Sequence, residues 1–111
     1  MDRLDISLLE ELRQIMPEDM RSLIAEFELD TRKRLSILDA AILSRDAETL
    51  RSNAHCLKGG AASLGAVRLS ELFFALEVRA KEECFEGIED VFAKIQHDFE
   101  ETIKALQRWL A

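Results

Sequence analysis

The chain has 111 residues, of which 48% are hydrophobic and 33% are charged. This length predicts one domain, residues 1–111, with a single hydrophobic core, and the composition is that of a globular chain rather than a disordered one. The formal net charge of −7 opposes binding to nucleic acid or to an anionic membrane.

Targeting features point to the cytoplasm. No apolar run approaches the roughly 20 residues that span a bilayer, and the opening MDRLDISLLEEL has acids where a signal peptide has its basic region. Cys56 and Cys84 form neither a closely spaced ligand pair nor a disulfide framework, which fits a reducing compartment. We therefore expect a cytoplasmic protein without a metal site.

The first predicted element is a short helix from Asp5 to about Ile15. Ser7 and Glu10 stand at the spacing of a capping box near its start. Its inner face is expected to consist of Leu8, Leu12 and Ile15.

A long second helix is predicted to end near Ser44. Pro17 suits its first turn, and Glu18 and Asp19 suit the positive end of the helix dipole. Its inner face is expected to consist of Met20, Leu23, Ile24, Phe27, Thr31, Leu35, Leu38 and Ile42.

Three further helices are predicted, the first capped by Asp46 and the last beginning after Gly87. Their inward stripes are expected to be Leu50, Ala54, Leu57, Ala61 and Leu64; Leu69, Leu72, Phe73, Leu76 and Ala80; and Ile88, Phe92, Ile95, Phe99, Ile103, Leu106 and Leu110. No segment alternates as a half-buried strand does. We therefore predict an all-α antiparallel four-helix bundle, with the short additional N-terminal helix as a lid across one end.

The segment AHCLKGGAASLG, residues 54–65, places two adjacent glycines inside the third helix, although each costs about 1 kcal/mol relative to alanine. At 100° per residue, His55 points about 140° away from the core stripe and into solvent. Gly59 and Ala62 follow it one and two turns later, which clears space beside the ring for another protein. Gly60 points toward the side of the core stripe, where we expect a neighbouring helix to approach closely.

Two cations lie near His55 on the predicted helix. Lys58, three residues later, can bring its ammonium to an anionic group attached to the imidazole. Arg51, one turn earlier, can contribute in the same way. An ordinary solvated charge is the alternative for Lys58.

These residues resemble the signature of histidine-containing phosphotransfer (HPt) domains, the carriers of phosphorelays. The family pattern is a histidine, a lysine three residues later, a glycine directly after it, a small residue, and a second glycine several residues further on. The matching residues are His55, Lys58, Gly59, Gly60 and Gly65. The flanking segments LRSNAHCLKG and LSELFFALE are also similar to the family, and the resemblance covers nearly the whole chain. It implies a four-helix bundle with a short extra helix.

The resemblance implies a function in two-component signalling. His55 would accept a phosphoryl group, at Nε2, from an aspartyl phosphate of a response-regulator receiver domain and pass it to the aspartate of another receiver. Lys58 and Arg51 would offset the added charge, about −1.5 to −2 at pH 7. A hybrid sensor kinase is a further expected partner, and we expect the carrier to be a monomer.

The chain shows no glycine-rich nucleotide loop and no Walker pattern. We therefore expect no cofactor and no ATP or phosphatase chemistry of its own, with magnesium and the acids that bind it in the receiver. An exposed imidazole is mostly uncharged at neutral pH, so one ring nitrogen is free to act as a nucleophile.

Partner contacts are predicted on two surfaces. Ile6 and Leu9 of the first helix are apolar residues near which the resemblance places a receiver contact, and packing against the bundle end is the alternative for both. Glu48 and Ser52 share the face of His55 and are expected to form polar contacts at the rim of the interface.

Other functions remain open. A phosphorylation-independent helical module that binds a kinase or regulator is the first alternative. A small enzyme that uses Cys56 or His55 is the second, although adjacent helical residues diverge by about 100° and make a poor dyad. His97 has no lysine or glycine partner and is expected to be an ordinary surface residue.

Overall fold

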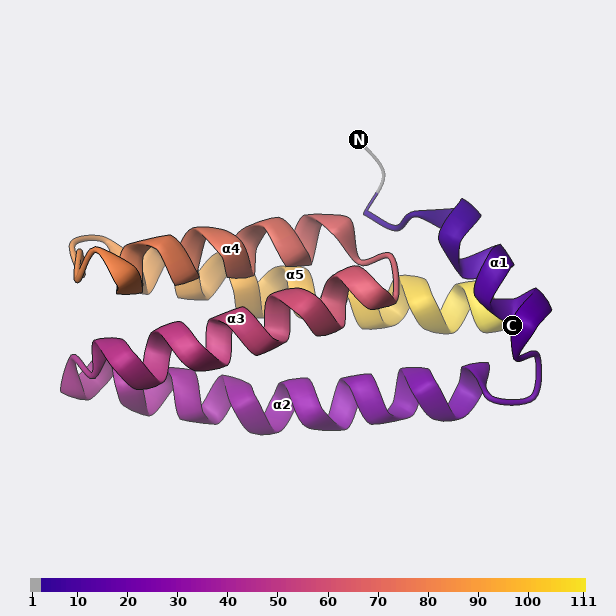
Figure 1. Cartoon of the computed structure of the whole chain (residues 1–111), viewed down its shortest axis with the longest axis horizontal. Helices are drawn as coiled ribbons and strands as arrows, with labels where there is room; N and C mark the ends of the chain where they lie inside the picture. The colour runs from indigo at the N-terminus through magenta and orange to yellow at the C-terminus, as the bar shows by residue number, and fades with distance from the viewer. Residues whose placement is uncertain (1–2) are drawn as a thin grey trace.

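The computed structural model describes residues 3–111, and within them the chain forms five helices. These are α1 (Ile6–Ile15), α2 (Met20–Ser44), α3 (Ala47–Ser63), α4 (Val67–Lys81) and α5 (Ile88–Leu110). Helices α2 to α5 run antiparallel along the 42 Å axis of the molecule, and α1 lies across one end (Figure 1). Because α2 packs on α3 and α5, and α4 packs on the same two helices, the predicted all-α bundle with an extra N-terminal helix is confirmed.

The core follows the predicted stripes of the four long helices. Each bundle helix turns its periodic apolar residues inward, and Leu50, Phe73, Leu76, Ile95 and Phe99 are completely buried. Full burial of one such side chain contributes about 1.5–3 kcal/mol. The predicted core residues that stay partly exposed, at the edges of the stripes, are Leu23, Phe27, Leu35, Leu72 and Leu110.

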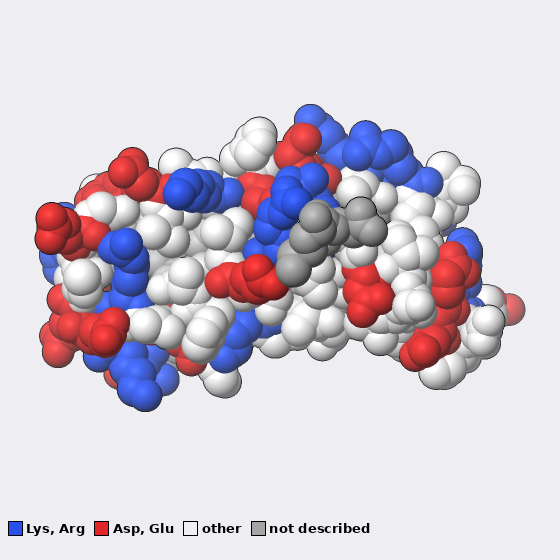
Figure 2. All heavy atoms as spheres, turned by 90° about the horizontal axis from the view of Figure 1, so that it is seen from above, with Lys and Arg blue, Asp and Glu red and all other residues white. Residues whose placement is uncertain are grey.

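Helix α2 begins slightly later than the sequence predicts. Pro17, Glu18 and Asp19 form a turn before the helix instead of its first turn. Within residues 3–111, none of the helices combines the length and the apolar character that crossing a membrane requires. The face seen in Figure 2 carries acidic and basic side chains interspersed, without a continuous stripe of one sign.

Helix α1 differs from the prediction in its cap and its inner face. The carboxylate of Asp5, not Ser7, caps the helix by accepting a hydrogen bond from the backbone N–H of Leu8 at 3.1 Å. Leu9 is completely buried, whereas Ile15, predicted to face inward, is 78% exposed. The predicted inner face of α1 is therefore wrong at Ile15, whereas Leu12 is partly buried against the core, as predicted.

The reason lies in the residues before α1, which are tied to the turn between α3 and α4. Leu4 forms an isolated antiparallel bridge with Ala66, and the Asp5 N–H donates to the Gly65 carbonyl at 2.7 Å. Gly65 has a φ of 69°, and a Cβ there would lie 3.0 Å from the Asp5 carbonyl oxygen. This anchored start fixes which face of α1 meets the bundle.

The other end of α1 is held by α5. The indole N–H of Trp109 donates to Glu10 Oε1 at 3.1 Å, and the Arg13 guanidinium lies 4.4 Å from the centre of the Trp109 ring. A cation over an indole contributes about 0.5–1 kcal/mol at an exposed site. The predicted position of α1 as a lid across the bundle end is confirmed.

A partly buried ion pair, which the sequence did not predict, links the N-terminal segment to α5. Asp98 is buried, and Arg3 donates to its Oδ1 from Nε at 3.2 Å and from Nη2 at 2.9 Å. The hydroxyl of Thr102 donates to Oδ2 at 3.2 Å. Such a pair adds little net stability, but removing one partner leaves an uncompensated buried charge. It thus fixes the position of the segment before α1.

Candidate functional site

His55 lies near the middle of α3, on the face opposite its core stripe. Its side chain is 61% exposed, while Ala54 and Leu57 on the same helix are buried. This is the orientation that the helical projection predicts. The ring is therefore accessible to a partner molecule.

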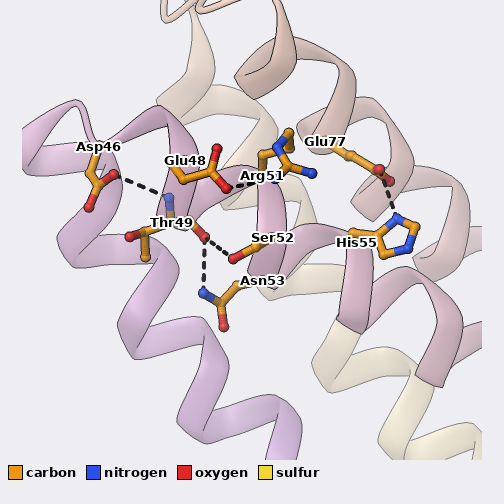
Figure 3. A network of polar contacts seen from close by, with 8 residues as sticks. All are labelled: Asp46, Glu48, Thr49, Arg51, Ser52, Asn53, His55 and Glu77. Carbon is orange, nitrogen blue, oxygen red and sulfur yellow. Dashed lines mark hydrogen bonds and ion pairs between the residues drawn. The ribbon is translucent and has the colours of Figure 1, made fainter.

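Glu77 of α4 is the residue at this site that the sequence analysis missed. Its Oε2 lies 2.9 Å from His55 Nδ1 (Figure 3). Its Oε1 lies 2.8 Å from Lys58 Nζ, as an ion pair without hydrogen-bond alignment. The Glu77 side chain is only 16% exposed. One carboxylate thus joins the imidazole and the lysine that the sequence motif places on α3.

The Glu77 contact determines which ring nitrogen carries the proton. The pKa of Glu77 lies below its ordinary value, chiefly because of the contact with Lys58 and to a smaller extent because of His55, while burial acts in the opposite direction. An ionised carboxylate only accepts hydrogen bonds, so Nδ1 of His55 is the donor. Nε2 then holds the free lone pair, on the side of the ring away from Glu77.

Lys58 is held in place from two sides. Besides its contact with Glu77, its Nζ lies 5.1 Å from the centre of the Phe74 ring. The hydroxyl of Ser70 on α4 donates to the Lys58 carbonyl at 3.1 Å, which ties the two helices together. Lys58 is therefore not the ordinary solvated charge that was its alternative interpretation.

The two glycines of the motif both face open space. Gly59, Gly60 and Ala62 are exposed, and a Cβ added at either glycine would meet no atom within 4 Å. The predicted clearance beside Gly59 is present. The expected close approach of a helix at Gly60 is wrong, because no atom of a neighbouring helix lies within 4 Å of that position. Figure 1 shows that α3 inclines away from α2 toward its C-terminal end.

This open space leads to a stability prediction. Gly59→Ala and Gly60→Ala should each raise the free energy of unfolding by about 0.5–1 kcal/mol, because alanine removes the cost of glycine inside a helix. Gly65→Ala should lower it, because its positive φ and the nearby Asp5 backbone leave no room for a methyl group. Urea denaturation of the three variants measures the effect. A loss of stability at Gly59 would contradict the open space.

The polar residues one and two turns before His55 pair among themselves. Arg51 donates to Glu48 Oε1 at 2.7 Å rather than contacting the ring, and the Ser52 hydroxyl donates to the Thr49 carbonyl at 3.4 Å (Figure 3). Glu48 and Ser52 are exposed, as a rim contact requires. A hollow between the start of α3 and the end of α4 is lined by Arg51, Glu77 and Lys81, among others.

The two residues of α1 predicted to contact a partner have different environments. Ile6 is exposed, whereas Leu9 is completely buried against the bundle. The partner contact predicted for Leu9 is therefore wrong, and its alternative, packing on the bundle end, is correct. The cause is the anchored start of α1, which turns Leu9 inward.

The remaining candidates are all exposed. Cys56 and Cys84 are exposed free thiols, and His97 is exposed on α5, as expected for a surface residue. Among residues 3–111, no three histidine, cysteine, aspartate or glutamate side chains are grouped as a metal site.

The site and the bundle can be compared with known proteins. The family model of the Hpt domain matches residues 7–109. The crystal structure of histidine-containing phosphotransfer protein B (HptB) from Pseudomonas aeruginosa PAO1 matches with a TM-score of 0.93 and 29% sequence identity, over 97% of this chain and 94% of that chain. Comparison with curated protein sequences found no match. The chain therefore belongs to the Hpt domain family, the histidine phosphotransfer proteins of phosphorelays.

Proposed function

We propose that the chain carries a phosphoryl group on Nε2 of His55, receives it from the aspartyl phosphate of one receiver domain, and delivers it to the aspartate of another. The observation that carries this proposal is the contact between Nδ1 and Glu77, which leaves Nε2 of an exposed ring as the acceptor. The motif around His55 supports the same choice, because His97 has neither a lysine nor a glycine at matching positions.

The transfer forms one bond and breaks one. The lone pair of Nε2 attacks the phosphorus, the bond from phosphorus to the donor's aspartate oxygen breaks, and its electron pair leaves with the carboxylate. The proton on Nδ1 stays in place, so the phosphorylated ring is an imidazolium. The ionised carboxylate of Glu77 offsets the positive charge that develops on the ring. The same steps in reverse deliver the group to the next receiver.

Lys58 is the first cation available to the new phosphoryl group. Its ammonium contacts the same carboxylate that holds the ring, so it needs only a side-chain rearrangement to reach an anion on His55. A phosphoryl charge of about −1.5 to −2 attracts it strongly. Arg51 is a second cation, and its exposed pair with Glu48 is worth at most about 1 kcal/mol and can exchange.

The bare surface at Gly59 and Ala62 gives a receiver room to bring its aspartate to the ring. The chain offers no acidic cluster of its own for magnesium among its described residues. We therefore assign the magnesium ion and the acids that bind it to the receiver, and the nucleophile and its supporting charges to this chain.

Incubation with a phosphorylated receiver domain tests the proposal. We expect the wild-type protein to acquire an acid-labile, base-stable label, and phosphorus NMR to place it on a histidine Nε2. A label on Nδ1, or on another type of side chain, would contradict the role of Glu77. If no receiver of the host labels the protein, the phosphorylation-independent binding module is favoured instead.

A further inference from the structure

Two apolar side chains stand exposed on α4 beside the proposed phosphorylation site. Phe74 is 53% exposed, although the adjacent Phe73 is completely buried, and Val78 one turn later is 36% exposed. Glu77 lies between them in the sequence and contacts His55. Phe74 and Val78 therefore project from neighbouring positions of α4, within one helical turn of the carboxylate that contacts the ring.

Packing within the bundle does not account for the exposed Phe74 ring. Its contact with Lys58, at 5.1 Å from the ring centre, contributes about 0.5–1 kcal/mol at such an exposed site. Burying a phenylalanine side chain would contribute about 1.5–3 kcal/mol. The contact with Lys58 therefore contributes less than burial of the ring would, and the exposed apolar surface of Phe74 remains available to a partner.

A receiver that reaches His55 must cover the surface around it. A stable interface buries about 800 Å² on each partner, which corresponds to a disc of about 16 Å radius. Glu77 touches the ring, and Phe74 and Val78 lie within one helical turn of Glu77. Both side chains therefore fall inside the area that the receiver covers.

We propose that Phe74 and Val78 form an apolar docking surface on α4 for the receiver partner, which rests on the phosphoryl transfer proposed above. Aromatic side chains at the centre of an interface carry much of its binding energy. Lys58 and Arg51 lie on the same side of the molecule and complement the acidic site that a receiver presents. Docking on α4 adds to any contact that Ile6 makes from α1.

The test compares three variants in transfer from a phosphorylated receiver domain, measured over a range of receiver concentrations. Phe74→Ala should raise the concentration for half-maximal transfer about tenfold, with a smaller change in the maximal rate. Phe74→Leu should restore most of the affinity, because leucine keeps an apolar surface at this position. It lacks the aromatic ring that contacts Lys58, so it separates the apolar contact from the cation contact. Leu43→Ala is the matched control, since Leu43 is 80% exposed and borders a hollow between α2 and α5.

Several outcomes would overturn the docking surface. One is an unchanged half-saturation in Phe74→Ala, and another is an equal loss in Leu43→Ala. If Phe74→Leu behaves as Phe74→Ala does, the ring acts through Lys58 and not as an apolar contact. Transfer to the wild-type protein is measured first, because its absence would refute the proposed function and the docking surface with it. Circular dichroism of each variant confirms that the bundle is intact.

Discussion

Replacing His55 with glutamine should abolish phosphotransfer from any receiver and leave the bundle intact. The amide of glutamine has no nucleophilic nitrogen, because its lone pair is delocalised into the carbonyl group. The His55 side chain is largely exposed, so the substitution removes no core contact, and a surface change of this kind alters the free energy of unfolding by about 0.5 kcal/mol or less. Radiolabel transfer and urea denaturation measure the two effects.

The second histidine of the chain supplies a matched control for this variant. His97 is exposed on α5 and lies in the segment IQHDFEE, without the lysine and glycine that follow His55. His97→Gln should keep the full label and the stability of the wild-type protein. A label that persists in His55→Gln, or disappears in His97→Gln, would place the phosphorylated residue elsewhere.

The next largest effect is expected at Glu77. Glu77→Ala should slow transfer to His55 by about 10- to 100-fold, because a hydrogen bond to a charged group contributes about 1.5–3 kcal/mol. Without the carboxylate, no hydrogen bond holds the ring proton on Nδ1. The positive charge of the phosphorylated ring is then also not offset. Single-turnover labelling by a phosphorylated receiver measures the rate.

Glu77→Gln separates the two contributions of this carboxylate. Its amide oxygen can still accept a hydrogen bond from the Nδ1–H, but it carries no charge, so the transfer rate should lie between those of the wild-type and alanine proteins. The lowered pKa of Glu77 supplies a readout besides transfer. The ionised carboxylate stabilises the fold above its ordinary pKa, and this contribution is lost as the pH falls through the lowered value. The difference in unfolding free energy between wild type and Glu77→Gln should therefore shrink on acidification, and a constant difference would contradict the ion pair with Lys58.

The four long helices could be predicted because each apolar stripe repeats over many turns. In α3 the apolar residues from Leu50 to Ala61 point in the same direction over several turns, so only one face of the helix can pack against the core. Helix α1 has only 10 residues, and two of its faces carry leucines. The choice between them was made by the contacts of Leu4 and Asp5 with the turn between α3 and α4, which no local pattern contains.

At the candidate site, too, the features that depend on one helix could be predicted, and the contact between two helices could not. The exposure of His55 and the clearance at Gly59 follow from one helix alone, and the helical projection predicted both. Glu77 lies 22 residues from His55, and its contact depends on how α4 is aligned against α3. Its place directly after the buried Leu76, at the edge of the α4 stripe, was the signal that could have identified it. The wrong prediction of a close helix contact at Gly60 has the same cause. The apolar stripe of α3 predicts where a side chain points, but not how closely a neighbouring helix approaches it.

The short turn at residues 64–66 sets the register between the nucleophile and its carboxylate. Gly65 closes this turn against the backbone of Asp5, which leaves little freedom in its length or path. One residue inserted within α4 between Leu69 and Glu77 would rotate Glu77 by about 100° from the core stripe of that helix and carry it off the imidazole, with every side chain of the motif on α3 still present. The closed turn at the remote end of the hairpin and the unbroken spacing along α4 together keep Glu77 against Nδ1 of His55.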